Sequence, residues 1–468
     1  MNEPVDHRES SLKRYPLSDA QHWFCDGDQG DEAGTFANRF TVAIAVRISG
    51  RVDVGALQGG LCDIVRRHEI LRTIVVQDAK PRYQQVYPPA PAALEVRDLP
   101  PVQGKSRDAY AQETIIRAAR RRMDVRTLPL LRAELNRFDD QDSVLIVCSH
   151  HSAVDGWSMS VIVRDLATFY KARSTGCQVE VPDGPQYRDF VAWQRARCKG
   201  PGAARRLEYW TERLSGARIF SPPTNGTVPG PDSRPYSAYY FTIDPTIAAE
   251  TIKLSTVMRS SVFMILLAAF NVLAHEIAGT TDPVVNTFSS GRSDPSIYNI
   301  VGPVVNVLPL RTNMDSCLTF RDVVRCTRQT CLGAYSHDIP TALIEEQAPT
   351  LNDAPDGSGR CNFFAFSMFQ PHVNDAELGF ADSSYRIRKE IVQDEPESQD
   401  LAEGFRWDMD MLPSGEITCS LRYHPGEYDK ETVMGWLSAY HRILSGAVVN
   451  PDGEWKKLLV TPIPDRAG

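Results

Sequence analysis

A short apolar run that leads directly into a polar turn constrains the fold of this chain more than any other feature. Residues 143–148 (SVLIVC) have the apolar character of a strand that is buried on both faces. The turn HHSAVDG follows at once, and helical spacing of apolar residues resumes near 157–172. A buried strand that passes directly into a helix predicts an α/β fold.

The same alternation occurs on both sides of a segment rich in proline and glycine. Residues 215–235 form this segment, and their composition is typical of a surface linker. Before the segment, the pattern predicts a strand over 40–48 and helices near 53–69 and 106–123. After it, the predicted elements are a strand at 236–243, a helix at 261–277, a strand at 283–287, a hairpin over 405–422 and a helix near 429–445.

This twofold plan predicts the domain organisation. We expect an N-terminal lobe over residues 1–180, connecting helices and a linker over 181–235, and a C-terminal lobe over 236–468. Clefts between lobes are preferred places for ligand sites. The functional site is therefore expected where the two lobes meet.

Charge and hydropathy exclude several classes of function. Lys and Arg number 51 against 59 Asp and Glu, which gives a net charge of −8 without a long basic run, so we expect no nucleic-acid partner. The polar N-terminus lacks the apolar segment of a secretory signal, and the longest apolar run, residues 262–270, is about half a membrane span. We therefore expect no membrane partner and a cytoplasmic location. The ten cysteines form no zinc-type pattern, so no metal is expected.

The turn at residues 150–156 carries the candidate chemistry. Neighbouring side chains at a strand end point to opposite sides, so only one of His150 and His151 can face a given cleft. Asp155 follows four residues after His151, and Gly156 permits a tight turn or close approach by a substrate. An imidazole with a pKa of about 6.5 can accept a proton near neutral pH, and such a base contributes roughly 10²–10⁴ in rate. The alternative interpretation is a core histidine pair beside a helix cap.

Several segments, in order, resemble one family. Residues 150–156 resemble the HHxxxDG motif of the condensation domains of nonribosomal peptide synthetases, which belong to a superfamily that includes chloramphenicol acetyltransferase. The resemblance extends over about residues 15–440. Its other segments are Leu17–Trp23, Arg67–Thr73, Tyr187–Gln194, Gly291–Arg292 and Ile300–Arg311, with weaker matches at 337–340, 362–364 and 406–409.

The resemblance implies both fold and function. It implies two chloramphenicol acetyltransferase-like α/β lobes in a V shape, with the active site in a tunnel at their interface. It also implies a stand-alone condensation enzyme of secondary metabolism, because no adenylation domain or carrier motif accompanies these segments. Such an enzyme transfers an acyl or aminoacyl group from the phosphopantetheine thioester of a peptidyl carrier protein to a small amine or alcohol, and it needs no cofactor of its own.

The resemblance further assigns roles to the residues of the turn. His151 is expected to act as general base or to orient the nucleophile, and the Gly156 N–H is a possible oxyanion donor. His150 is expected to be a structural neighbour. Asp155 is expected to pair with Arg292 and to shape the turn, and not to act as a base.

Other positions are assigned less directly. Asn362 and Ser158 are candidate substrate contacts. The charged residues of the 67–73 segment (Arg67, His68, Glu69 and Arg72) are expected to form a structural network.

Two main alternative functions remain open at this point, beside a hydrolase or epimerase that would use the same tunnel. The first is a coenzyme A-dependent acyltransferase of the same superfamily, because the His-x-x-x-Asp-Gly core is common to both branches. The second is a non-catalytic module that recruits a carrier protein. Replacement of His151 by Ala separates a recruiter from an enzyme.

Overall fold

The protein is described by a computed structural model. The described residues are 12–28, 30, 34–36, 40–100, 106–177, 183–225, 236–353, 363–369, 393–397 and 404–459. They form two compact α/β units, as the sequence predicts. Unit 1 contains the described residues up to Gly200 together with Ser290–Val305, and unit 2 contains the others. Residues 183–200 and 290–305 therefore pack with the N-terminal part of the chain.

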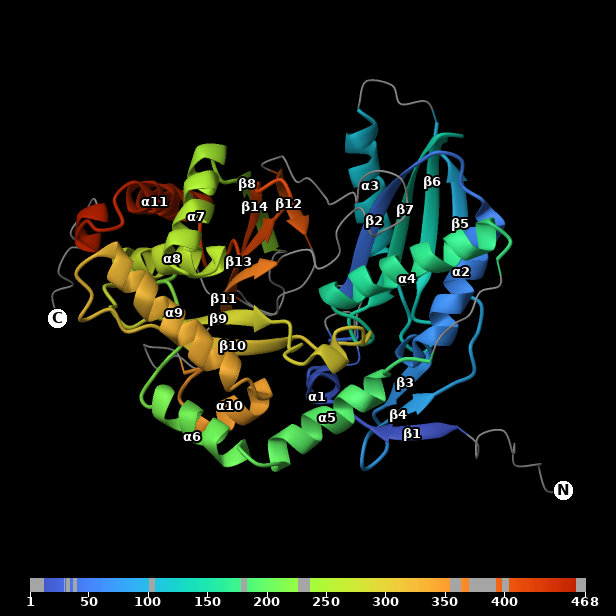
Figure 1. The fold of residues 1–468 in the computed structure, drawn as a ribbon, viewed down its shortest axis with the longest axis horizontal. Helices are drawn as coiled ribbons and strands as arrows, with labels where there is room; N and C mark the ends of the chain where they lie inside the picture. Colours follow the sequence, from blue (N-terminus) through green and yellow to red (C-terminus); the bar gives the residue numbers. More distant parts are fainter. Residues whose placement is uncertain are drawn as a thin grey trace. The chain divides into compact units, whose positions relative to one another are not determined.

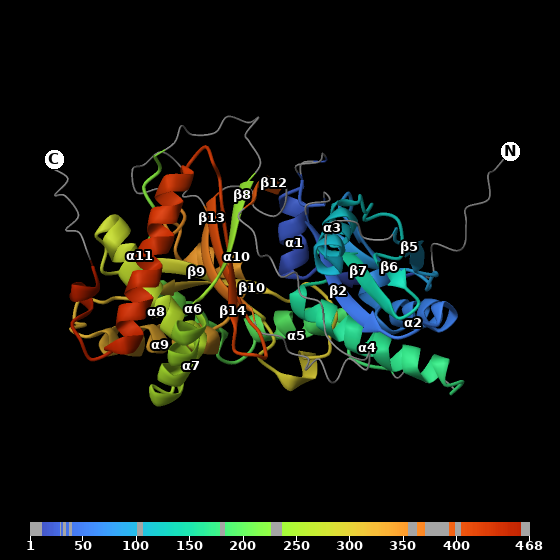
Figure 2. The same cartoon turned by 90° about the horizontal axis from the view of Figure 1, so that it is seen from above.

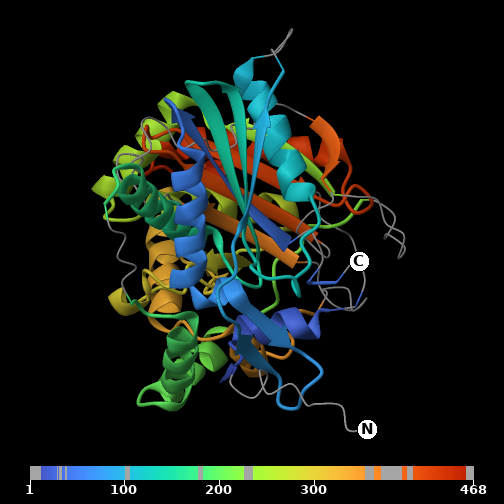
Figure 3. The same cartoon turned by 90° about the vertical axis from the view of Figure 1, so that its right-hand side faces the viewer.

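Unit 1 is built on a four-stranded mixed sheet in the order β2-β7-β6-β5, in which only the β5–β6 pair is parallel. The α2 and α4 helices cover one face of this sheet, and α3 covers the other (Figures 1 and 3). The elements of this layer are β2 (Thr41–Ser49), α2 (Val54–Arg67), β5 (Ala93–Asp98), α3 (Arg107–Arg120), β6 (Arg132–Asp139), β7 (Asp142–His150) and α4 (Gly156–Ser174).

A second, three-stranded antiparallel sheet and several short elements complete unit 1. These are β1 (Lys13–Pro16), α1 (Asp19–Asp26), the 3-10 helix η3 (Glu69–Arg72), β3 (Thr73–Val76), β4 (Tyr83–Val86), α5 (Tyr187–Lys199) and the 3-10 helix η4 (Pro295–Ile297).

The β7 strand is buried on both faces, as its apolar run predicts. Leu145 and Val147 pack among the α2 and α4 side chains, whereas Val144, Ile146 and Cys148 pack beneath α3. Each fully buried large aliphatic side chain contributes roughly 1.5–3 kcal/mol. The strand that ends at His150 is therefore firmly fixed at the centre of its sheet.

Unit 2 is built on a seven-stranded sheet in the order β10-β9-β11-β13-β14-β8-β12, where β11 runs parallel to both of its neighbours. The α8 and α11 helices lie side by side next to this sheet (Figure 2). The elements are α6 (Ala203–Arg213), β8 (Tyr236–Thr242), α7 (Pro245–Val257), α8 (Val262–Ala278), β9 (Val284–Ser289), β10 (Asn306–Arg311), α9 (Phe320–Ser336), α10 (Thr341–Gln347), β11 (Phe363–Phe369), β12 (Gln393–Glu397), β13 (Gly404–Met411), β14 (Ile417–Tyr423), α11 (Lys430–Val449) and the 3-10 helix η6 (Trp455–Leu458).

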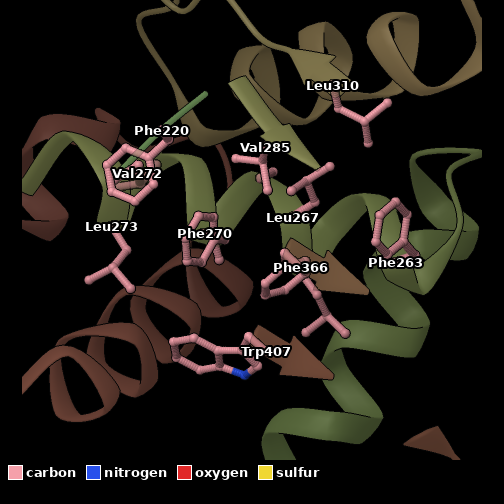
Figure 4. Close-up of a cluster of buried hydrophobic side chains, with 14 of the residues drawn as sticks. Phe220, Phe263, Leu267, Phe270, Val272, Leu273, Val285, Leu310, Phe366 and Trp407 are labelled. Atoms are coloured by element: carbon pink, nitrogen blue, oxygen red, sulfur yellow. The ribbon is translucent and has the colours of Figure 1, made fainter. Parts of the chain in front are cut away.

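The apolar α8 helix forms the centre of the unit 2 core. Its Phe270 ring packs 5.0 Å from the ring of Phe366, which in turn lies 6.1 Å from the ring of Trp407 (Figure 4). Among the described helices, none alone is long and apolar enough to cross a membrane. The α7 and α8 helices satisfy that test only when taken together, and they bend by 108° at their junction.

The prediction of a surface linker over residues 215–235 is wrong for its first part. Ile219 and Phe220 are buried in the unit 2 core, each about 5% exposed. Their backbone N–H groups donate to Leu351 O and Val284 O at 2.9 and 2.8 Å. These two apolar side chains anchor the segment although prolines and glycines surround them. Residues 226–235 lie outside the described part of the chain.

Candidate active site

The predicted functional turn joins β7 to α4. The N–H groups of Ala153 and Val154 both donate to the His150 carbonyl, at 2.9 and 3.2 Å, and close the turn. Asp155 is the N-cap of α4, where its carboxylate accepts the Ser158 N–H at 2.8 Å. The short connection therefore follows directly from a capping residue placed five positions after the strand end.

The two adjacent histidines have different environments. His150 is fully buried, and its Nδ1 lies 2.9 Å from Ser152 Oγ and accepts the Ser152 N–H at 3.1 Å. The backbone N–H of His151 donates to Phe40 O at 2.7 Å, while its half-buried ring packs 5.9 Å from the ring of Phe24. The Nδ1 atom of His151 has no hydrogen-bond partner among the described residues. One imidazole is thus committed to the turn, and the other retains an unpaired nitrogen.

Asp155 and Arg292 form a buried, bidentate ion pair. Arg292 Nη1 lies 2.7 Å from Asp155 Oδ2, and Nη2 lies 3.1 Å from Oδ1. The two side chains are 4% exposed or less. Burial opposes the charge of the carboxylate, but the Arg292 guanidinium and the hydrogen bonds from Arg292 and Ser158 outweigh it and hold the pKa of Asp155 below its usual value. The carboxylate is therefore ionised at neutral pH.

The carboxylate of Asp155 is saturated with donors. Its Oδ1 accepts from the N–H and hydroxyl of Ser158, and its Oδ2 accepts from the N–H groups of Val304 and Val305 at 3.0 and 3.2 Å. These bonds add to the two from Arg292. We call Asp155, Arg292, Ser158, Gly302 and Val304 the Asp155 network. Asp155 has no remaining lone pair for a histidine.

Ser158 lies inside this network. Its hydroxyl is fully buried, lies 2.7 Å from Asp155 Oδ1 and 2.9 Å from Gly302 O, and accepts the Gly302 N–H at 3.0 Å. These protein contacts favour a structural role over the predicted substrate contact. Asn362, the other predicted substrate contact, lies outside the described residues.

Gly156 opens α4 and is exposed. A Cβ placed on it would meet no heavy atom within 4 Å, so the space beside its backbone is open. As the first helical residue, its N–H has no acceptor within the helix and lies at the positive end of the helix dipole. These features suit a backbone N–H that meets a developing negative charge.

The backbone at position 291, directly before Arg292, requires a glycine. Its φ of +65° lies in the left-handed region, and a Cβ there would overlap the carbonyl oxygen of Val304. The close approach of these two backbone segments brings Arg292 and Val304 together on the same carboxylate.

The segment at residues 67–73 forms the structural network that the sequence predicts. His68 Nε2 lies 3.0 Å from Asp165 Oδ2, and Arg67 Nε lies 2.9 Å from the same oxygen. Glu69 pairs with Arg188 of α5. Burial lowers the pKa of His68 although Asp165 opposes this effect. The segment thus connects α2, α4 and α5.

Sequence reasoning missed a set of contacts around Tyr187. Its phenol lies 2.6 Å from Ser18 Oγ and donates to Pro303 O at 3.0 Å. All three residues belong to segments that resemble the family, and this shared membership was the only sequence signal for these contacts.

The described residues offer no cluster of three or more His, Cys, Asp or Glu side chains that could hold a metal ion.

Comparison with solved structures defines the class of protein. The fold is α/β with two chloramphenicol acetyltransferase-like lobes. A crystal structure of SgcC5 from Streptomyces globisporus, in complex with (R)-(-)-1-(2-naphthyl)-1,2-ethanediol and sucrose, is 32% identical, with a TM-score of 0.80 over 94% of this chain and 100% of that chain. The X-domain from teicoplanin biosynthesis shares the fold at 22% identity, with a TM-score of 0.74 over 98% of this chain and 99% of that chain.

The chain belongs to the condensation-domain family, because the Condensation domain model matches residues 11–466. One of the linear gramicidin synthase proteins from Brevibacillus parabrevis is 30% identical over 97% of this chain. The chain spans only 6% of the length of that relative. The family connects the chain with nonribosomal peptide synthesis and with transferase chemistry.

Proposed function

We propose that this protein is a free-standing condensation enzyme that transfers an acyl or aminoacyl group from a carrier-protein thioester to a small acceptor. The observation that carries the proposal is the contrast between the two histidines. His150 is held by Ser152, whereas His151 Nδ1 is unpaired among the described residues, and the backbone of Gly156, five residues further along the chain, borders open space. Such an imidazole can take the proton that an attacking nucleophile must lose.

The proposed reaction is a single acyl transfer. The acceptor oxygen or nitrogen attacks the thioester carbonyl, and His151 orients it and takes its proton. The Gly156 N–H stabilises the oxyanion of the tetrahedral intermediate. When the intermediate collapses, the carbon–sulfur bond breaks and the phosphopantetheine thiol leaves with the proton. His150, Asp155 and Arg292 hold the turn, and the enzyme itself needs no cofactor.

We propose an alcohol as the acceptor to test first. The SgcC5 structure contains an aryl-1,2-ethanediol, and that protein is 32% identical to this chain. An alcohol is a weaker nucleophile than an amine, so it depends more on proton removal by His151. The expected product is an ester, and an amine acceptor would give an amide.

The test monitors the intact mass of an aminoacyl-loaded carrier protein in the presence of the enzyme and pooled amines and aryl-1,2-diols. We expect acceptor-dependent loss of the aminoacyl group, and a loss of turnover of at least about 10²-fold in His151→Ala. A matched control is His275→Ala, because His275 lies on α8 in unit 2.

Other outcomes would overturn the proposal. Turnover from acyl-coenzyme A but not from the loaded carrier would assign the chain to the coenzyme A-dependent branch. Carrier binding without turnover, equal in the wild type and His151→Ala, would identify a recruitment module.

A further inference from the structure

A buried phenol connects three segments of unit 1 that lie far apart in the sequence. Tyr187 is 2% exposed, and its Oη lies 2.6 Å from Ser18 Oγ and 3.0 Å from Pro303 O. A carbonyl oxygen can only accept, so the Tyr187 O–H donates to Pro303 and the Ser18 hydroxyl donates to Tyr187. Burial raises the pKa of Tyr187, which keeps this proton in place.

The Tyr187 hydrogen bond acts on a peptide group of the Asp155 network. The carbonyl of Pro303 and the N–H of Val304 belong to one peptide unit. Tyr187 donates to the oxygen of that unit, and its N–H donates to Asp155 Oδ2 at 3.0 Å. Hydrogen bonds in series polarise one another, so the phenol both orients and strengthens the bond to Asp155. Asp155 in turn caps the helix that begins at Gly156.

A second branch runs through α1. Ser18 is the N-cap of this helix, and the neighbouring Asp19 N–H donates to Gln194 Oε1 at 3.3 Å, so α5 holds the start of α1 at two points. Near the other end of α1, the ring of Phe24 packs 5.9 Å from the ring of His151. A change at Tyr187 therefore has two routes to His151: along the turn that ends at Asp155, and through the Phe24 ring of α1.

We infer that Tyr187 is a positioning residue that sets the orientation of His151 through the Asp155 network and α1. This inference rests on the proposed function for its kinetic consequence. The ring and the hydroxyl of Tyr187 have separable tasks: a Cβ at Gly302 would overlap the ring, so the ring fills space against that backbone. Tyr187→Phe keeps this packing and removes only the hydrogen bonds.

The experiment compares Tyr187→Phe with a matched control in unit 2. Tyr440 is also fully buried and donates to a backbone carbonyl, that of Leu266, at 3.2 Å. Tyr440→Phe therefore removes a comparable hydrogen bond that has no part in the Asp155 network. With a loaded carrier and an aryl-1,2-diol, we expect Tyr187→Phe to lower kcat roughly ten- to hundredfold while the KM of the acceptor changes less than about twofold. Both variants should lower Tm, and only Tyr187→Phe should lower kcat.

A second variant tests the link to α1. Ser18→Ala should lower kcat in the same direction, and the Ser18→Ala/Tyr187→Phe double variant should lose less than the product of the two single effects, because they break one connected chain of hydrogen bonds. Multiplicative effects would show that the two residues act independently and would overturn the α1 branch.

A structural measurement separates failure of this inference from failure of the proposed function. In protein with ¹³C-labelled histidine, the His151 ring signal is assigned by its loss in His151→Ala. We expect Tyr187→Phe to shift that signal and Tyr440→Phe to leave it unchanged. If the wild type is inactive with every donor, the proposed function fails while the ring signal still tests the connection. An unshifted His151 signal in Tyr187→Phe, or a kcat equal to that of Tyr440→Phe, would overturn the inference.

Discussion

At the scale of single residues, the hydrogen bonds to the Asp155 carboxylate determine whether this group can act as a base. Six donor contacts, three on each oxygen, come from Ser158, Arg292, Val304 and Val305. A carboxylate that is engaged in this way is a weak base, and it cannot orient a histidine as the aspartate of a Ser-His-Asp triad does. Proton transfer in the proposed reaction is therefore assigned to His151 and not to Asp155.

Removal of this carboxylate should act mainly on stability. Asp155→Ala leaves the buried Arg292 without its charge partner, which typically costs about 3–5 kcal/mol. We expect the free energy of unfolding to fall by about this amount, measured by urea denaturation, and the Asp155→Ala/Arg292→Leu double variant to be destabilised by less than the sum of the single effects. Full stability with abolished turnover would instead show that Asp155 takes part in the chemistry.

Residues of the site differ in how far the sequence could predict them. The histidine turn could be predicted from the sequence because the strand, the turn and the helix cap follow one another along the chain. The Asp155–Arg292 pair joins residues 137 positions apart, and only the family resemblance suggested it. The Ser18–Tyr187 contact spans 169 positions, and no local pattern encodes it. Asn362 lies outside the described residues, so its assignment stays a prediction.

At the scale of elements, local patterns determined most helices and strands. The predicted hairpin is present, with β13 and β14 joined by a turn in which Gly415 has a φ of +85°. Local sequence patterns do not predict which side chains connect one element to another. His68, which ends α2, connects that helix to Asp165 of α4 at 3.0 Å, and this contact depends on the three-dimensional packing.

The His68 contact should make stability depend on pH. Burial lowers the pKa of His68 in the folded state, with Arg67 and Arg164 acting in the same direction and Asp165 against them. The unfolded chain binds a proton near pH 6.5, so the stabilisation is complete above that pH and is lost as the pH falls below it. We expect the wild type to lose more Tm between pH 7.5 and pH 5.5 than His68→Gln.

The comparison with His68→Gln isolates this residue, because His441, whose pKa is also lowered by burial, is present in both proteins. Identical pH dependence of Tm in the two proteins would contradict the assignment.

At the scale of the whole molecule, each unit has its own sheets and its own apolar core. Composition misled the prediction for residues 215–235, because prolines and glycines dominate that window while two apolar residues determine where its first part lies. Ile219 and Phe220 fasten this stretch to the unit 2 core. The Phe220 ring packs 5.3 Å from that of Phe364.

Truncation of Phe220 should therefore destabilise unit 2. Phe220→Ala leaves a cavity in the core and is expected to lower the free energy of unfolding by about 3–5 kcal/mol. Leu318→Ala serves as the control, because Leu318 is 75% exposed and a surface substitution typically changes stability by less than about 0.5 kcal/mol. Equal unfolding curves for the two variants would contradict the packing of Phe220 in the unit 2 core and would support a surface linker over residues 215–225.

The assignment of residues 290–305 to unit 1 has a consequence for how the protein is made. Among the described residues, Asp155 pairs with Arg292, which is synthesised only after the chain between Pro201 and Ser289 that belongs to unit 2. At about 5–20 residues per second, Arg292 leaves the ribosome on the order of 5–20 s after residue 200. During that interval the nascent histidine turn lacks its guanidinium and the Val304 N–H. The N-terminal part of the chain therefore emerges first but completes its folding late, after α6, β8, α7, α8 and β9 of unit 2 have been translated.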